Sequence, residues 1–131
     1  DTELRRWVAN QVMAFCLRHH ATHVFVEDYP RHGAFNIGRL AQLHGVLKDR
    51  LWYEANLAVV PVNMSSARKL LLGKLPRGKG MAKKTVLEAL RSIWLRGIDD
   101  AQADAFCVAN FARSELGLWA VAGAAESGKA A

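Results

Sequence analysis

The sequence of 131 residues has only two cysteines and three prolines, and it has no long apolar run. The two cysteines do not form a CxxC pair, so the paired thiolates of a structural zinc site are absent. No apolar run approaches the roughly 18 to 20 residues that span a bilayer. We also find no charged and then apolar leader with a small-residue cleavage site. We therefore expect a reducing, cytoplasm-like compartment, no membrane association, and buried thiols at Cys16 and Cys107.

The composition that remains is typical of one globular domain. Hydrophobic residues make up 51% of the chain and four residues are Trp, which favours a folded over a disordered protein. The length suffices for a real hydrophobic core. We see no internal repeats. We expect one domain over residues 1–117, followed by an Ala/Gly-rich tail at 118–131.

The charge of the chain is unevenly distributed. The formal net charge is +6, yet no acidic residue occurs between Glu54 and Glu88. This acid-free stretch contains three glycines and seven basic residues, which are Arg68, Lys69, Lys74, Arg77, Lys79, Lys83 and Lys84. A flexible basic loop of this kind favours contact with the phosphate groups of a polyanion. A solvated loop without a partner is the alternative.

Hydrophobic periodicity predicts the order helix, strand, helix, strand, and then three more helices. The expected strands cover 22–28 and 57–62. The expected helices cover 3–20, 35–56, 66–72, 81–95 and 99–117. This order favours an α/β layer with parallel strands joined by helical crossovers. Two strands make a poor sheet, so we expect either unrecognised strands or a chain that lacks strands of its fold.

Several large side chains fall on apolar faces of the expected helices. In the first helix, one face at helical spacing contains five apolar residues, which are Leu4, Val8, Val12, Phe15 and Cys16. Trp7 also lies on an apolar helical face, and we expect it to belong to the core. Trp52 could stack on a base, but the core is the interpretation that we favour for it.

Three aspartates are concentrated near the start of the last expected helix. Asp100 and Asp104 are four residues apart, so their Cβ atoms should lie roughly 5 to 6 Å apart on one face. Carboxylates this close repel each other beside a core unless a divalent cation lies between them. Mg²⁺ binds one or two carboxylates together with water and phosphate oxygens. Helix capping and the helix dipole explain Asp99 and Asp100 without a metal, but they do not explain Asp104.

A fourth carboxylate ends the first expected strand. Glu27 follows three apolar residues, and the carboxyl ends of buried strands in α/β sheets are where ligand crevices form. If the last helix packs beside this strand, Glu27 faces Asp104 and a carboxylate-lined metal site results. An acid at an exposed strand tip is the alternative, and it fits Asp28 better than Glu27. Tyr29, which follows directly, is a candidate for stacking on a DNA base.

Five segments together resemble the RuvC-like Holliday-junction resolvases, particularly the phage-type members. In order, they are "VFVEDY", "GVLKDRL", "VVPVNMSSARKLLLG", "GKGMAKKTV" and "IDDAQADAFCVA". The resemblance covers about residues 5 to 116. It implies an RNase H-like α/β fold, with a mixed sheet flanked by helices. The N-terminal strands that carry the family's first catalytic Asp have no counterpart in this chain.

The resemblance also implies a function. The chain would be an Mg²⁺-dependent endonuclease, with Mn²⁺ as a possible substitute, that cuts four-way or other branched DNA by two-metal phosphodiester hydrolysis. It would act as a homodimer in the cytoplasm of a bacterial or phage-infected cell. Glu27, Asp100 and Asp104 would be catalytic, and these three with Asp99 would bind the metal ions. Lys79, Lys83 and Lys84 match the family's basic segment near DNA.

Two alternatives stay open. The absence of the family's first Asp favours a non-catalytic nucleic-acid-binding protein on the same RNase H-like core. A protein-interaction module on a helical α/β scaffold is the other alternative, and it would bind no DNA even at low salt.

Overall fold

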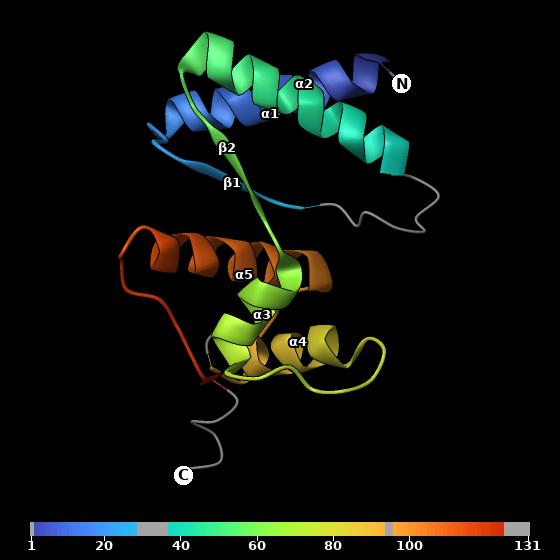
Figure 1. The fold of residues 1–131 in the computed structure, drawn as a ribbon, viewed down its shortest axis with the longest axis vertical. Helices are drawn as coiled ribbons and strands as arrows, with labels where there is room; N and C mark the ends of the chain where they lie inside the picture. The colour runs from blue at the N-terminus through green and yellow to red at the C-terminus, as the bar shows by residue number, and fades with distance from the viewer. Residues whose placement is uncertain (1, 29–36, 94–95, 125–131) are drawn as a thin grey trace. The chain divides into compact units, whose positions relative to one another are not determined.

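The computed structural model describes residues 2–28, 37–93 and 96–124 (Figure 1). In these ranges the elements follow the predicted order of helices and strands. They are α1 (Thr2–Arg18), β1 (Val24–Glu27), α2 (Ile37–Ala55), β2 (Val59–Val62), α3 (Met64–Leu72), α4 (Met81–Ile93) and α5 (Asp100–Glu115). The chain divides into two compact units, residues 1–61 and 62–131, and the division falls within β2. We describe each unit by itself.

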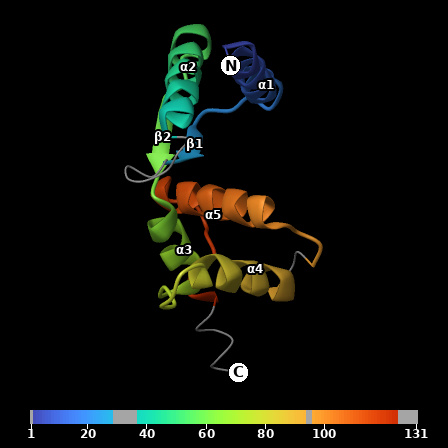
Figure 2. The same ribbon diagram turned by 90° about the vertical axis from the view of Figure 1, so that its right-hand side faces the viewer.

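The first unit is built around the packing of α1 on α2, which lie side by side in both ribbon views (Figures 1 and 2). Its core joins three residues of α1 to two of α2 and one that follows α2. They are Ala9, Met13, Cys16, Leu47, Leu51 and Leu57. β1 and β2 form a small parallel sheet, and Val24 and Val59 from these strands pack against the core.

The predicted RNase H-like fold is wrong. The structure is mostly helical (66%), and its only sheet among the described residues consists of two short parallel strands rather than a mixed sheet. The physical reason is that period-two or continuous β-branched patterns occur only in the two short segments that form β1 and β2. Elsewhere the apolar residues recur at helical spacing and form helices. The larger sheet was implied by the resemblance alone.

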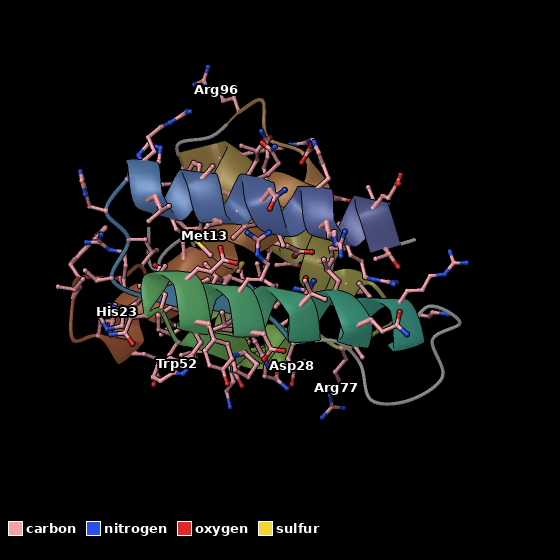
Figure 3. The ribbon with its side chains drawn as sticks, turned by 90° about the horizontal axis from the view of Figure 1, so that it is seen from above. Met13, His23, Asp28, Trp52, Arg77 and Arg96 are labelled. Carbon is pink, nitrogen blue, oxygen red and sulfur yellow. The ribbon has the colours of Figure 1, made fainter. Side chains whose placement is uncertain are left out.

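The predicted apolar face of α1 is buried only in part. Trp7 and Phe15 are 59% and 63% exposed, and Leu4 is exposed as well. Cys16 of the predicted face is buried and Val12 packs against the core. The other buried residues, Ala9 and Met13, lie next to Cys16 around the helix, because α1 has apolar residues on more than one side and periodicity cannot choose between them. Trp52 of α2 is exposed too, and it lies on the side of α2 away from α1, whereas Met13 lies between the two helices (Figure 3).

The second unit is a packed set of three helices, in which α3, α4 and α5 each contact the other two (Figure 2). Its buried apolar residues include Leu71 and Leu72 of α3, Val86 and Leu90 of α4, and Cys107 of α5. Capping explains where the helices begin. The Asn63 side chain accepts a hydrogen bond from the Ser66 backbone N–H at the start of α3.

A segment after α5, residues 118–123, runs back across the second unit, and we call it the return segment. The buried Asn110 side chain of α5 donates to the Val121 carbonyl oxygen at 2.8 Å and accepts from the Val121 N–H at 2.7 Å. Arg113 Nε donates to the Trp119 carbonyl oxygen at 2.8 Å. The Gly123 N–H donates to the Leu70 carbonyl oxygen at 3.2 Å. The expected tail at 118–131 therefore begins with a segment fixed to α3 and α5.

Within the described ranges, no helix combines the length and the apolar character that crossing a bilayer requires.

Candidate nucleic-acid interface

A loop at residues 73–80 joins α3 to α4, and we call it the basic loop. Gly73, Gly78 and Gly80 have left-handed φ angles of 90°, 110° and 75°, which glycine adopts without steric cost. A Cβ at Gly78 would lie 2.9 Å from Cγ of Met81, so this turn needs glycine for space as well. The three glycines therefore shape a tight, exposed turn.

Basic side chains project from this turn and from the helices beside it. Five of the predicted DNA-binding residues are exposed and form no ion pair with any acidic residue in the described ranges. We call them the basic surface, and they are Lys69, Lys74, Arg77, Lys79 and Lys84. Lys83 is also exposed, but its Nζ lies 3.8 Å from the Asp100 carboxylate. Such an exposed pair contributes little to stability, so Lys83 can exchange its partner at small cost.

The positive charge is concentrated in the second unit. Residues 62–131 contain eleven Lys and Arg against six Asp and Glu, a net charge of +5, whereas residues 1–61 contain seven against six. The first turn of α4 contains no acidic residue, so the positive end of that helix dipole reinforces the charge of the basic loop. Most of the net positive charge of the chain therefore belongs to the second unit, which also contains the basic loop.

Two of the predicted metal ligands act at the start of α5. Asp99 is the N-cap, because its side chain accepts from the Gln102 N–H at 2.8 Å and the Gln102 side chain accepts from the Asp99 N–H at 3.0 Å. This reciprocal pair is a capping box. Asp100 is exposed in the first turn, where the helix dipole favours a negative charge. Both residues therefore have structural roles that require no metal ion.

Asp104 has a cationic partner within the protein. Its carboxylate lies 2.9 Å from a guanidinium nitrogen of Arg68, and the two side chains are only 17% and 19% exposed. The pair joins α5 to α3. Arg68 is thus not part of the exposed basic surface, although the sequence grouped it with those residues. The spacing of the aspartates predicted a divalent cation beside Asp104. In the structure, the positive charge beside this carboxylate is the guanidinium group of Arg68.

Each of the three carboxylates at the start of α5 has a partner within the second unit. Asp99 caps a helix, Asp104 pairs with Arg68, and Asp100 lies beside Lys83. No group of three or more His, Cys, Asp or Glu side chains suited to a metal ion occurs in the part of the chain that the structure describes. Glu27 is exposed at the end of β1 and belongs to the first unit. Tyr29, the remaining predicted DNA contact, lies outside the described residues.

The sequence predicted buried thiols, and both cysteines are buried and free. Cys107 follows Asp104 by three residues on α5. The pKa of the Cys107 thiol is raised to about 11, mainly by burial and also by the nearby Asp104 carboxylate, while Arg68 opposes these two effects. Burial also raises the pKa of Cys16. Thiols held in their neutral form are poor nucleophiles and poor metal ligands, so neither cysteine is a candidate for chemistry.

We expect the stability difference between the native chain and Cys107→Ala to depend on pH. The thiol ionises near pH 9 in the unfolded chain and at about 11 in the folded one. Above pH 9 the unfolded chain therefore binds fewer protons than the folded chain. The contribution of the thiol to the free energy of unfolding is complete below pH 9 and is lost as the pH rises towards 11. The loss amounts to at most about 2 to 3 kcal/mol. Urea unfolding of both proteins from pH 8 to pH 10.5 measures it, and a constant difference would contradict the assignment.

Asn110 is the structural residue that sequence reasoning missed. It lies on the buried side of α5 at helical spacing from Ala103 and Cys107, and it is 4% exposed. A polar residue on an apolar stripe signals a buried hydrogen bond, because an unpaired buried amide is costly. The same signal applied to Asp104, but its partner is 36 positions away and could not be identified from spacing.

Comparison with family models, curated proteins and solved structures yields no match to the chain. The resemblance to RuvC-like resolvases therefore stays a prediction that rests on the quoted segments.

Proposed function

We propose that this protein binds nucleic acid through the basic surface and the basic loop of its second unit. The observation that carries the proposal is the set of five exposed cations without an acidic partner among the described residues. Lys and Arg side chains form most contacts that neutralise a phosphate backbone, and such contacts require no particular base sequence.

The geometry of the loop supports the same function. Glycines at positions 78 and 80 leave the backbone bare between Arg77, Lys79 and the start of α4. A phosphate can therefore approach the chain closely there, at the positive end of a helix dipole. Arg77 offers a planar fork of donors, while Lys79 and Lys84 act as point charges. The combination suits a backbone contact rather than readout of base edges.

Metal-dependent cleavage of branched DNA is a second candidate, which the resemblance implies. Glu27 ends β1, as the resemblance implies, but it is exposed there, and this also fits an acid at a strand tip without a metal ion. The pairing of Asp104 with Arg68 weighs against it. We therefore rank cleavage below binding as a function of this chain. The homodimer and the cytoplasmic location are implied by the same resemblance and stay proposals with it.

A triple variant of the basic surface, Arg77→Gln with Lys79→Gln and Lys84→Gln, tests the binding proposal. We expect its affinity for a fluorescent DNA duplex at 0.1 M salt to fall by about 10- to 100-fold, because three phosphate contacts are lost. The slope of log affinity against log salt should become shallower by nearly three. Fluorescence anisotropy over a range of salt concentrations measures both quantities.

The matched control carries the same change of net charge on the first unit. Arg6, Arg18 and Arg39 are exposed and form no ion pair with a described acidic residue, so Arg6→Gln, Arg18→Gln and Arg39→Gln together remove three charges there. This variant should keep most of its affinity. Equal losses in the two triple variants would assign binding to net charge alone, and absence of binding at low salt would refute the proposal.

Adding Mg²⁺ or Mn²⁺ to a labelled four-way junction in the same assay tests cleavage.

A further inference from the structure

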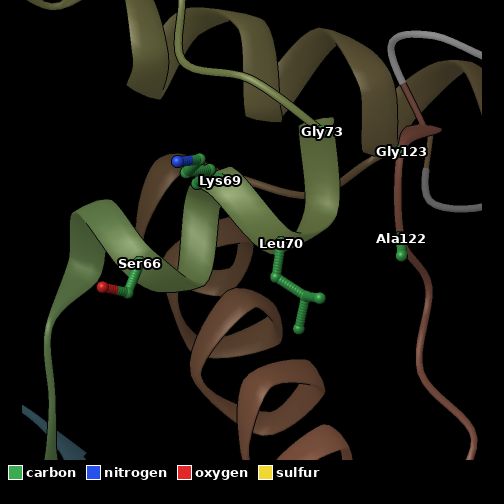
Figure 4. A pocket seen from close by; sticks show the side chains of 6 residues that line it. All are labelled: Ser66, Lys69, Leu70, Gly73, Ala122 and Gly123. Atoms are coloured by element: carbon green, nitrogen blue, oxygen red, sulfur yellow. The ribbon is translucent and has the colours of Figure 1, made fainter.

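A hollow lies on the second unit between α3 and the return segment (Figure 4). It has a volume of about 590 Å³, within the range of roughly 300 to 1,000 Å³ that is usual for small-molecule sites. Its lining consists of Ser66, Lys69, Leu70, Gly73, Ala122 and Gly123. The hollow is thus shared by one helix and one irregular segment that is distant in sequence.

Hydrogen bonds hold the two walls in place. The Gly123 N–H donates to the Leu70 carbonyl oxygen, and the buried Asn110 amide fixes Val121, the neighbour of Ala122. Gly73 and Gly123 both have left-handed φ angles, of 90° and 65°. Glycine suits both positions, and the missing side chains leave this end of the hollow open. The site exists without a ligand.

The lining combines apolar walls with a polar edge. Leu70 of α3 and Ala122 of the return segment supply hydrocarbon surface (Figure 4), and Ser66 and Lys69 add a hydroxyl and an ammonium group to the lining. Lys69 makes no ion pair with any acidic residue that the structure describes. A flat heteroaromatic ring with polar edges, attached to a negatively charged group, complements such a lining.

The position of the hollow identifies the source of that ring. Gly73 lines the hollow and is also the first residue of the basic loop, and Lys69 belongs to the basic surface. A nucleic-acid strand that contacts Lys69 and the basic loop would therefore lie beside the hollow. A base within a duplex is stacked and paired, so only an unpaired base is free to enter.

We propose that the hollow accepts one unpaired nucleobase of nucleic acid bound to the basic surface. The inference rests on the proposed function and narrows its substrate to nucleic acid that contains unpaired nucleotides. The walls contribute apolar contact with the faces of the base. Ser66 and Lys69 contact its polar edge or the adjoining phosphate.

The test compares a fully paired duplex with the same duplex carrying one unpaired 2-aminopurine nucleotide. The native chain should bind the second about tenfold more tightly, as expected for contact with one base. Ala122→Trp fills the hollow from the return segment and Ser66→Phe fills it from α3. Each should remove this preference while affinity for the paired duplex stays unchanged. The control Ala109→Trp adds the same side chain to an exposed position of α5 outside the hollow, and it should retain the preference.

The outcomes separate the inference from the proposed function. Equal affinity of the native chain for both duplexes overturns the inference and leaves the proposed function intact. Absence of binding to either duplex at low salt overturns both. A preference that survives in both filling variants places the unpaired base elsewhere and overturns the inference. Two fillers on different elements keep the test valid if one of them fails to fold.

Discussion

Replacing Asp104 with asparagine is expected to lower the free energy of unfolding of the second unit by about 2 to 3 kcal/mol. The carboxylate lies 2.9 Å from Arg68 and both side chains are largely buried. Asparagine preserves the shape but leaves the guanidinium charge without a countercharge. Arg68 Nε is already buried without a hydrogen-bond partner among the described residues, so little else compensates the charge. Partial exposure of the pair keeps the cost below that of a fully buried pair.

A second pair of variants separates the ion pair from the carboxylate itself. Arg68→Met should destabilise the unit by a comparable amount, because it leaves Asp104 unpaired. Arg68→Met combined with Asp104→Leu should recover much of the loss, because apolar replacement of both partners removes the desolvation cost. Urea unfolding followed by Trp fluorescence in a Trp7→Phe and Trp52→Phe background reports on the second unit, since the two remaining tryptophans both lie in residues 62–131. Full stability of Asp104→Asn would disprove the structural role of the pair.

The same variants bear on catalysis. If metal-dependent cleavage is detected and Asp104 is a ligand, Arg68→Met should remain active whereas Asp104→Asn should not. If Asp104 acts only through its ion pair, both variants should lose function in proportion to their loss of stability.

Replacing Asn110 with alanine is expected to cost about 2 to 3 kcal/mol, because Val121 loses both hydrogen-bond partners in a buried setting. Asn110→Asp is the matched control for geometry. It retains an acceptor for the Val121 N–H but places a negative oxygen against the Val121 carbonyl, so it should be at least as costly.

Hydrogen exchange measures this effect locally. In either variant the Val121 amide should exchange faster than in the native chain, while amides of α4 should change less. Unchanged protection of Val121 would show that the return segment is held by other contacts.

The sequence predicted the local structure well. Helix capping, as at Asn63 and Asp99, involves residues only a few positions apart, and so does the spacing of apolar residues. The order of helices and strands could therefore be inferred from the sequence. The burial of both cysteines followed from the same patterns. The basic loop was recognised because an excess of Lys, Arg and Gly is visible without any tertiary structure.

Long-range features could not be inferred in this way. The side of α1 that is buried depends on the surface of α2, and both sides of α1 are apolar. The partner of Asp104 is Arg68, which lies on another helix. The sequence predicted that a metal ion would offset the repulsion between Asp100 and Asp104, because the position of Arg68 could not be inferred from spacing. The RNase H-like sheet was carried over from a resemblance, and the local patterns of this chain supply only two strands.

The contact between Asn110 and Val121 has a consequence for how the chain can vary during evolution. The amide recognises only the main chain of residue 121, one donor and one acceptor, and is indifferent to its side chain. Substitutions in the return segment can therefore accumulate while its path stays the same, with two exceptions. Proline at position 121 lacks the N–H that Asn110 accepts from, and position 123 has a left-handed φ of 65° that suits glycine. The wall of the hollow formed by residue 122 can thus diversify on a constant backbone, as the loops of other scaffolds do.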